Sequence, residues 1–193
     1  MKILVLDNYD SFTYNLVHLI RANGFSLDII RNDKIDLSEI KKYDKILLSP
    51  GPGIPEEAGI MKPLVKEYGA TKSILGICLG HQGIAEVYGA SLYNIPSVLH
   101  GVTSMAQITS EEEYLFNGVP QTFQATHYHS WAVRPDSLTP DLKVTSTNTE
   151  GMVMAISHVR YDVKGFQFHP ESIMTPDGPK MIKNWLNDKS GIA

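Results

Sequence analysis

Cys78, the only cysteine of this 193-residue chain, lies between two glycines in the segment Gly-Ile-Cys-Leu-Gly. An apolar run at residues 73–77 precedes it and residues with helical spacing follow it, so we expect Cys78 on a tight strand-to-helix turn. Such a turn exposes a nucleophile at the positive end of a helix, which favours a thiolate and an oxyanion. The alternative is an inert core thiol, because most lone cysteines are small buried residues.

A base for this thiol is offered by His169 in the segment Gln-Phe-His-Pro-Glu-Ser. Pro170 ends the preceding strand and keeps His169 extended. Residues two apart in an extended segment face the same side, so Glu171 can fix the tautomer of the His169 imidazole. Cys78, His169 and Glu171 are therefore a candidate catalytic triad. The alternative is an ordinary polar turn after a strand.

A third segment, Ser-Pro-Gly-Pro-Gly at residues 49–53, follows another apolar strand. Its prolines and glycines predict an irregular turn with free amides at the sheet edge where Cys78 would project. Gly51 and Gly53 would supply backbone donors there without side-chain obstruction. Taken alone, such a segment is most often only a turn.

Strands and helices that could position these residues follow from the hydrophobic pattern. In the first half, strands are expected at residues 2–6, 27–30, 46–48 and 73–77. A helix is expected after the first strand, with Asp10 or Ser11 as its N-cap and Gly24 as its end. The second half has strand-like runs at 122–125, 131–133, 142–146, 152–156 and 165–168, then a helix at 179–186. This predicts an α/β fold in one domain over residues 1–193: a mixed, largely parallel central sheet with helices on both faces.

Composition narrows the classes of partner. The net charge is −4 and the Lys and Arg residues form no basic stripe, so nucleic acid is not expected. The longest apolar run, residues 152–156, is far shorter than a membrane span, so no membrane insertion is expected either. A single thiol and the absence of a signal-like N-terminal segment favour the cytoplasm.

Together, the segments Ser-Pro-Gly-Pro-Gly, Gly-Ile-Cys-Leu-Gly-His-Gln and Gln-Phe-His-Pro-Glu-Ser resemble the class I glutamine amidotransferases in their order and spacing. The resemblance covers nearly the whole chain and implies a flavodoxin-like core. Within that family, residues 6–16, the His100-Gly101 pair and Tyr-His-Ser at 128–130 are similar to the small subunits of anthranilate synthase and aminodeoxychorismate synthase.

The resemblance implies that Cys78 hydrolyses L-glutamine through a thioester, with His169 as acid and base and Glu171 as its orienting partner. It implies that glutamine and the oxyanion are bound by Gly51, Pro52, Gly53, Leu79, Gln82, Ser130 and Trp131. It implies no cofactor and no metal in this chain. The implied partner is a larger chorismate-binding synthase subunit that makes anthranilate. Aminodeoxychorismate as product, or a subunit shared by both pathways, is the alternative.

Three positions depart from the pattern of the family. Trp131 stands where the family usually has Leu, which would change the shape of the glutamine pocket. Val102 and His127 stand where Lys and Arg are common, so we expect an altered charge on a partner-facing surface near the active-site mouth. Two rival functions use the same residues: a stand-alone γ-glutamyl cysteine hydrolase, and a non-catalytic binding module, which the intact triad disfavours.

Overall fold

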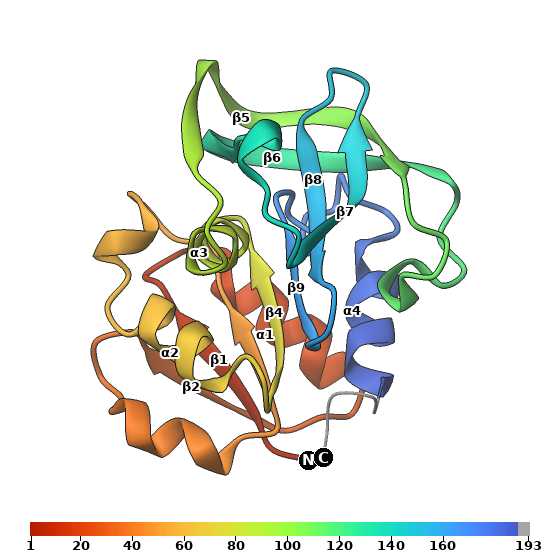
Figure 1. The fold of residues 1–193 in the computed structure, drawn as a ribbon. Coiled ribbons are helices and arrows are strands. Elements are labelled where there is room, and N and C mark those ends of the chain that lie inside the picture. The colour runs from red at the N-terminus through yellow and green to blue at the C-terminus, as the bar shows by residue number, and fades with distance from the viewer. Residues whose placement is uncertain (189–193) are drawn as a thin grey trace.

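A mixed sheet of nine strands runs through residues 1–188, the part of the chain that the computed structural model describes (Figure 1). Its spatial order is β2-β1-β3-β4-β9-β8-β7-β5-β6. Strands on one side pair in parallel: β1 (Ile3–Asp7), β2 (Leu27–Arg31), β3 (Lys45–Leu48), β4 (Ser73–Ile77) and β9 (Val163–Phe166). Strands on the other side pair antiparallel: β5 (Leu92–Ile108), β6 (Thr122–Val133), β7 (Leu142–Asn148) and β8 (Val153–His158).

Helices cover both faces of the sheet: α1 (Thr13–Ala22), α2 (Met61–Tyr68), α3 (Leu79–Val87) and α4 (Gly178–Asn187). Side chains alternate between the faces along β1, because successive strand residues point to opposite sides. Ile3 and Val5 pack in one apolar cluster with α1 and α4. Leu4 and Leu6 pack in a second cluster with α2 and α3. β1, β3, β4 and β9 are therefore buried on both faces, whereas the edge strand β2 is only partly buried. The predicted α/β class with helices on both sides is confirmed.

The connecting segments contain short 3-10 helices: η1 (Leu37–Lys42), η2 (Pro55–Glu57), η3 (Tyr114–Phe116) and η4 (Pro135–Ser137). The N-cap prediction for α1 was wrong, because the helix begins at Thr13 and Phe12 holds the N-cap position without a side-chain cap. Asp10 instead accepts a hydrogen bond from the Phe12 amide at 2.7 Å, just before the helix. Gly24, with φ +84°, ends the helical segment as predicted.

The long hairpin of β5 and β6 differs most from the sequence prediction. Figure 1 shows it above α3, at the end of the molecule that carries the strand-to-helix turn after β4. Most side chains of β5 are exposed or half-buried, and its pairing with β6 shifts register between Asn94 and Leu99. The runs expected at 122–125 and 131–133 belong to one strand, which pairs with β5 along both runs. The polar side chains between the two runs hid this continuity from the hydrophobic pattern. Within residues 1–188, the helices are too short or too polar to cross a membrane.

Candidate active site

Cys78 lies on the turn between β4 and α3, where its φ of +52° is in the left-handed region. A residue with a Cβ is strained there, as at the nucleophile turn of an α/β hydrolase. The Cys78 amide donates to the Phe166 carbonyl at 2.7 Å, so β9 fixes the turn. A Cβ on Gly76 would lie 2.4 Å from the Gly80 carbonyl carbon, and one on Gly80 would lie 2.6 Å from the Leu48 carbonyl oxygen. A larger residue at either position would clash with the neighbouring backbone, so this turn requires both glycines.

His169 and Glu171 meet through their side chains, both almost fully buried. His169 Nδ1 lies 2.6 Å from Glu171 Oε1, so the carboxylate accepts its hydrogen bond and fixes the imidazole orientation. The His169 amide donates to the Thr126 carbonyl at 3.0 Å, which attaches this segment to β6. His169 Nε2 has no hydrogen bond to the described residues and is left for the Cys78 sulfur or a substrate.

The charge state of His169 is set by its two neighbours. Burial lowers the pKa of His169, but the Cys78 sulfur and the Glu171 carboxylate outweigh burial and raise that pKa to about 10. Cys78 raises this pKa both as a hydrogen-bond partner of the imidazole and through its charge, although the contact at His169 Nε2 lies outside the geometry of an ordinary hydrogen bond. The imidazole is thus protonated at neutral pH and holds a transferable proton beside Cys78.

Two aromatic rings hold the imidazole in place. Phe12 and Tyr128 lie with ring centroids 5.5 Å and 5.1 Å from that of His169, both nearly edge-on. The two rings also contact each other at 4.8 Å. The His169 ring is therefore confined by the residue before α1 and by β6 at once, which leaves it little rotational freedom.

The turn at residues 49–53 is attached to the ends of β1 and β2. Asn8 Nδ2 donates to the Ser49 carbonyl and the Asn8 amide donates to Ser49 Oγ, each at 2.8 Å. Asn32 Nδ2 in turn donates to Asn8 Oδ1 at 3.0 Å. A Cβ on Gly51 would lie 2.6 Å from Leu79 Cδ2, so the turn packs directly on the first residue of α3. The amides of the turn and of the Leu79 helix start therefore lie at one edge of the sheet.

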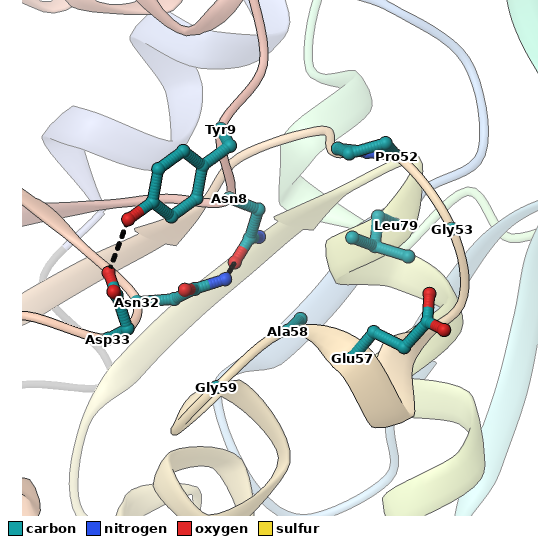
Figure 2. A pocket seen from close by; sticks show the side chains of 10 residues that line it. All are labelled: Asn8, Tyr9, Asn32, Asp33, Pro52, Gly53, Glu57, Ala58, Gly59 and Leu79. Carbon is teal, nitrogen blue, oxygen red and sulfur yellow. Dashed lines mark hydrogen bonds between the residues drawn. The ribbon is translucent and has the colours of Figure 1, made fainter.

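A cavity of about 400 Å³ lies on one side of this turn. Figure 2 shows the residues that line it, with the Asn8 and Asn32 side chains facing each other. Tyr9 donates to Asp33 at 2.6 Å at its rim. Pro52 and Gly53 line both this cavity and a second cavity of about 210 Å³. Cys78 lines only the second one. We therefore assign the chemistry to the smaller cavity, and the turn is the wall between the two.

The smaller cavity brings together most of the residues that the sequence predicts. Besides Cys78, its lining includes Gly51, Pro52, Gly53, Gln82, Ser130 and Trp131. Leu79 lines the larger cavity instead, with its amide at the start of α3. The remaining lining residues, which sequence reasoning did not assign to the site, are Val98, Leu99, His100, Tyr128 and His129. Within residues 1–188, no cluster of His, Cys, Asp and Glu side chains is arranged to hold a metal ion.

Gln82 has a fixed amide orientation in this cavity. Its Nε2 donates to the Trp131 carbonyl at 2.8 Å and to Gln167 Oε1 at 3.3 Å. Both N–H groups of Gln82 are thereby used, which leaves its Oε1 as an acceptor. Gln167 Nε2 donates in turn to Cys78 Sγ at 3.8 Å. Sequence reasoning missed Gln167, although its position two residues before His169 in an extended segment places both side chains on one face.

The expectation for His127 was wrong. The side chain is only 1% exposed and lies inside the hairpin, so it cannot alter a partner-facing charge. Val102, which is exposed, is its cross-strand partner in the ladder between β5 and β6. The two departures from the family pattern therefore lie opposite each other, and only one of them changes the surface.

The profile of the family "Glutamine amidotransferase class-I" matches residues 4–189. The chain therefore belongs to the class I glutamine amidotransferases, and the prediction made from its motifs is confirmed.

Individual relatives narrow the comparison. Anthranilate synthase component 2 of Mycobacterium tuberculosis is 42% identical over 191 residues, which are 96% of this chain and 82% of that protein. Aminodeoxychorismate/anthranilate synthase component 2 of Bacillus subtilis is 42% identical over 186 residues, 95% of each chain. The crystal structure of a candidate GMP synthase protein from Thermoplasma acidophilum has a TM-score of 0.85 at 28% identity. That match covers 96% of this chain and 92% of the other.

Proposed function

We propose that this chain is the glutaminase subunit of an anthranilate synthase, which hydrolyses L-glutamine and passes ammonia to a chorismate-binding partner. The observation that carries the chemistry is the convergence of Cys78, His169 and Glu171 beside a cavity of about 210 Å³. The reaction partner and product rest on the names of the relatives, which are second components of anthranilate synthases.

In the first step, the Cys78 sulfur attacks the side-chain amide carbon of glutamine. The amide oxygen becomes an oxyanion beside the Leu79 amide and the amides of the turn at 51–53, where the first N–H groups of α3 have no intrahelical acceptor. His169 Nε2 then gives its proton to the departing nitrogen, so ammonia leaves and a γ-glutamyl thioester remains. The raised pKa of His169, about 10, supports a proton ready at this atom.

In the second step, water attacks the thioester carbon and His169 Nε2 takes the proton of that water. The carbon–sulfur bond breaks, glutamate leaves, and the thiolate and imidazolium are restored together. Glu171 keeps Nδ1 protonated in both steps, so Nε2 alone exchanges protons with the substrate. The free Gln82 Oε1 is placed to accept from the α-ammonium of glutamine, while Ser130 and Trp131 contact the substrate through backbone groups.

A partner that receives ammonia directly has a physical advantage, because free ammonia in neutral water is mostly protonated and no longer nucleophilic. The B. subtilis relative is named for both products, which favours a second candidate: one subunit shared by anthranilate and aminodeoxychorismate synthesis. We also propose a cytoplasmic location, because a reducing compartment preserves a catalytic thiol.

The test combines the full chain with its candidate large subunit, chorismate and glutamine, and identifies the product chromatographically. Anthranilate supports the first proposal and aminodeoxychorismate the second. The matched control is Cys78→Ser, which should lose glutamine-dependent synthesis but retain synthesis from added ammonium salt, because the partner is intact. Full glutamine hydrolysis without the partner would identify a stand-alone hydrolase instead, and no hydrolysis with it would identify a binding module.

A further inference from the structure

A line of hydrogen bonds leads from half-buried Ser104 on β5 to the wall of the glutamine cavity. Ser104 Oγ lies 2.8 Å from His127 Nε2, and His127 Nδ1 lies 3.0 Å from His129 Nε2. His129 Nδ1 lies 2.8 Å from the Trp131 carbonyl oxygen. His127, His129 and Trp131 share one face of β6 because they are two residues apart. Neither imidazole has a part in the steps proposed for the triad.

Both imidazoles are neutral at pH 7. His127 is 1% exposed and His129 is 6% exposed. Burial lowers the pKa of His127 to about 4, and burial together with the charge of His127 lowers the pKa of His129 to about 3. The protonated His169 acts on both in the same direction. Each ring therefore has one nitrogen that donates and one that accepts.

The Trp131 carbonyl, at the end of this line of hydrogen bonds, determines which atom donates and which accepts in each of them. A carbonyl oxygen only accepts, so His129 must carry its proton on Nδ1 and accept at Nε2. His127 must then carry its proton on Nδ1 and accept at Nε2, where the Ser104 hydroxyl donates. One tautomer of each ring satisfies every contact, so the proton that His127 donates supports the same His129 tautomer that the Trp131 carbonyl requires.

We propose that His127 and His129 are positioning residues for glutamine binding, which together fix the Trp131 carbonyl and, through it, the Gln82 amide. The Trp131 oxygen accepts from His129 Nδ1 and from Gln82 Nε2, each at 2.8 Å, so both of its lone pairs are used. The peptide after Trp131 and the Gln82 side chain are thereby held in one arrangement. That arrangement turns Gln82 Oε1, and not its N–H groups, toward the substrate.

Loss of this positioning should change the binding of glutamine more than the rate of the chemical steps. The reacting atoms belong to Cys78 and His169, and His169 is held separately by Glu171. Trp131 and Gln82 line the cavity wall that would hold the amino-acid end of the substrate. This inference rests on the proposal that glutamine is the substrate of this cavity.

Two substitutions of similar shape at His127 test the N–H group that donates to His129, because one keeps a donor there and the other does not. In His127→Asn the amide nitrogen takes the position of Nδ1 and can still donate to His129, whereas His127→Leu has a similar shape and cannot. Steady-state glutaminase kinetics would be measured on each variant in the complete complex. We expect KM for glutamine to rise about tenfold in His127→Leu with kcat within about twofold, because a buried imidazole acceptor loses its donor. We expect His127→Asn to restore most of this loss.

A matched control removes a buried imidazole elsewhere. His158, 5% exposed at the end of β8, accepts the amides of Arg160 and Tyr161 through Nδ1. His158→Leu should lower thermal stability without changing KM, which separates positioning from general destabilisation. Equal KM values for His127→Leu and His127→Asn, or a loss confined to kcat, would overturn the proposal.

Nitrogen-15 NMR of the wild-type chain tests the tautomer directly and needs no variant to fold. At pH 7 we expect His129 to carry its proton on Nδ1. A proton on Nε2, or on both nitrogens, would overturn the proposal even if the kinetics agreed. If the wild-type complex hydrolyses no glutamine, the proposed function fails, while this spectrum still decides whether His129 donates from Nδ1 to the Trp131 carbonyl, as the positioning role requires.

Discussion

Acidification from pH 7 to pH 5 should destabilise this chain strongly, because four imidazoles are buried and have lowered pKa values. Three of them, His81, His127 and His129, have the largest shifts. His81 is fully buried on α3, and neither of its ring nitrogens has a hydrogen bond of ordinary geometry to the described residues. Burial lowers its pKa to about 4, and burial likewise lowers the pKa of His127 to about 4 and that of His129 to about 3. In the unfolded chain each titrates near its ordinary value of 6.5.

The numbers of protons bound by the folded and unfolded chains decide whether acidification raises or lowers the free energy of unfolding. Between pH 6.5 and pH 4 the unfolded chain binds a proton at each of these positions and the folded chain does not, so stability falls as pH falls. With 1.36 kcal/mol per pKa unit, each imidazole contributes a loss of about 2 kcal/mol between pH 7 and pH 5. The three together contribute about 6 kcal/mol, which is comparable with the whole stability of many domains.

His169 does not offset this loss. Its folded pKa is raised to about 10, so its contribution is fully present below pH 6.5 and is lost progressively as pH rises from 6.5 to about 10. In the window from pH 6.5 to pH 5 it is protonated in both the folded and the unfolded chain. The slope in that window therefore belongs to the buried neutral imidazoles.

Urea unfolding of the full chain at pH 7, 6 and 5 would measure the effect. His127→Asn should reduce the loss between pH 7 and pH 5 by about 2 kcal/mol, because one titrating group is gone. His18→Gln, at an exposed position on α1, is the matched control and should leave the loss unchanged. A wild-type chain with equal stability at pH 7 and pH 5, or a His127→Asn variant with the full loss, would refute the reasoning.

Three further predictions concern stability and the nucleophile. Gly80→Ala should cost more than about 3 kcal/mol in urea unfolding, because its Cβ would lie 2.6 Å from a β3 carbonyl oxygen that cannot yield; a loss below about 1 kcal/mol would show that β3 moves. Lys164→Met should cost about 3–5 kcal/mol in the same assay, because it leaves the buried Glu113 carboxylate, 3.1 Å away, without its cation. Restored stability on adding Glu113→Gln would identify the unpaired charge as the cause, and no recovery would contradict it. Gln167→Leu removes the amide that donates to the sulfur, so alkylation of Cys78 by iodoacetamide at pH 7 should slow about threefold. An unchanged rate, with folding verified by circular dichroism, would mean that this 3.8 Å contact does not stabilise the thiolate.

The parallel half of the fold and the triad could be predicted because their signals are local. Apolar runs mark β1, β3 and β4, and the glycines beside Cys78 mark a turn that no larger residue could make. The pair of His169 and Glu171 was expected from an extended segment, and that part of the reasoning was wrong: residues 169–172 form a turn closed by the Ser172 amide on the His169 carbonyl at 3.2 Å. The pairing was still predictable because the two residues lie only two positions apart, and the turn brings their side chains together. Each of these inferences needs only a few neighbouring residues and one general rule of backbone geometry.

The hairpin of β5 and β6 could not be predicted in the same way. Most of β5 is solvent-exposed, so it lacks the alternation that marks a half-buried strand, and its order comes from ladder pairing with β6. The buried polar side chains of β6 hide that strand as well. His127 and His129 are acceptable inside the protein only because they bond to each other, to Ser104 and to a carbonyl group. A single sequence does not show which distant residues will satisfy them.

The parallel and antiparallel halves of the sheet contribute different parts of the site. The parallel half supplies the nucleophile, the helix start and the turn at 49–53, all at the carboxyl ends of strands, where α/β proteins place reactive groups. The antiparallel half supplies the cavity wall at residues 128–131, and its Thr126 carbonyl holds the backbone of His169. Changes near Trp131 in the hairpin should therefore alter glutamine affinity, and only changes at the Thr126 carbonyl should shift the base. The strained Cys78 turn should persist in both cases, because β4, β9 and α3 fix that turn independently.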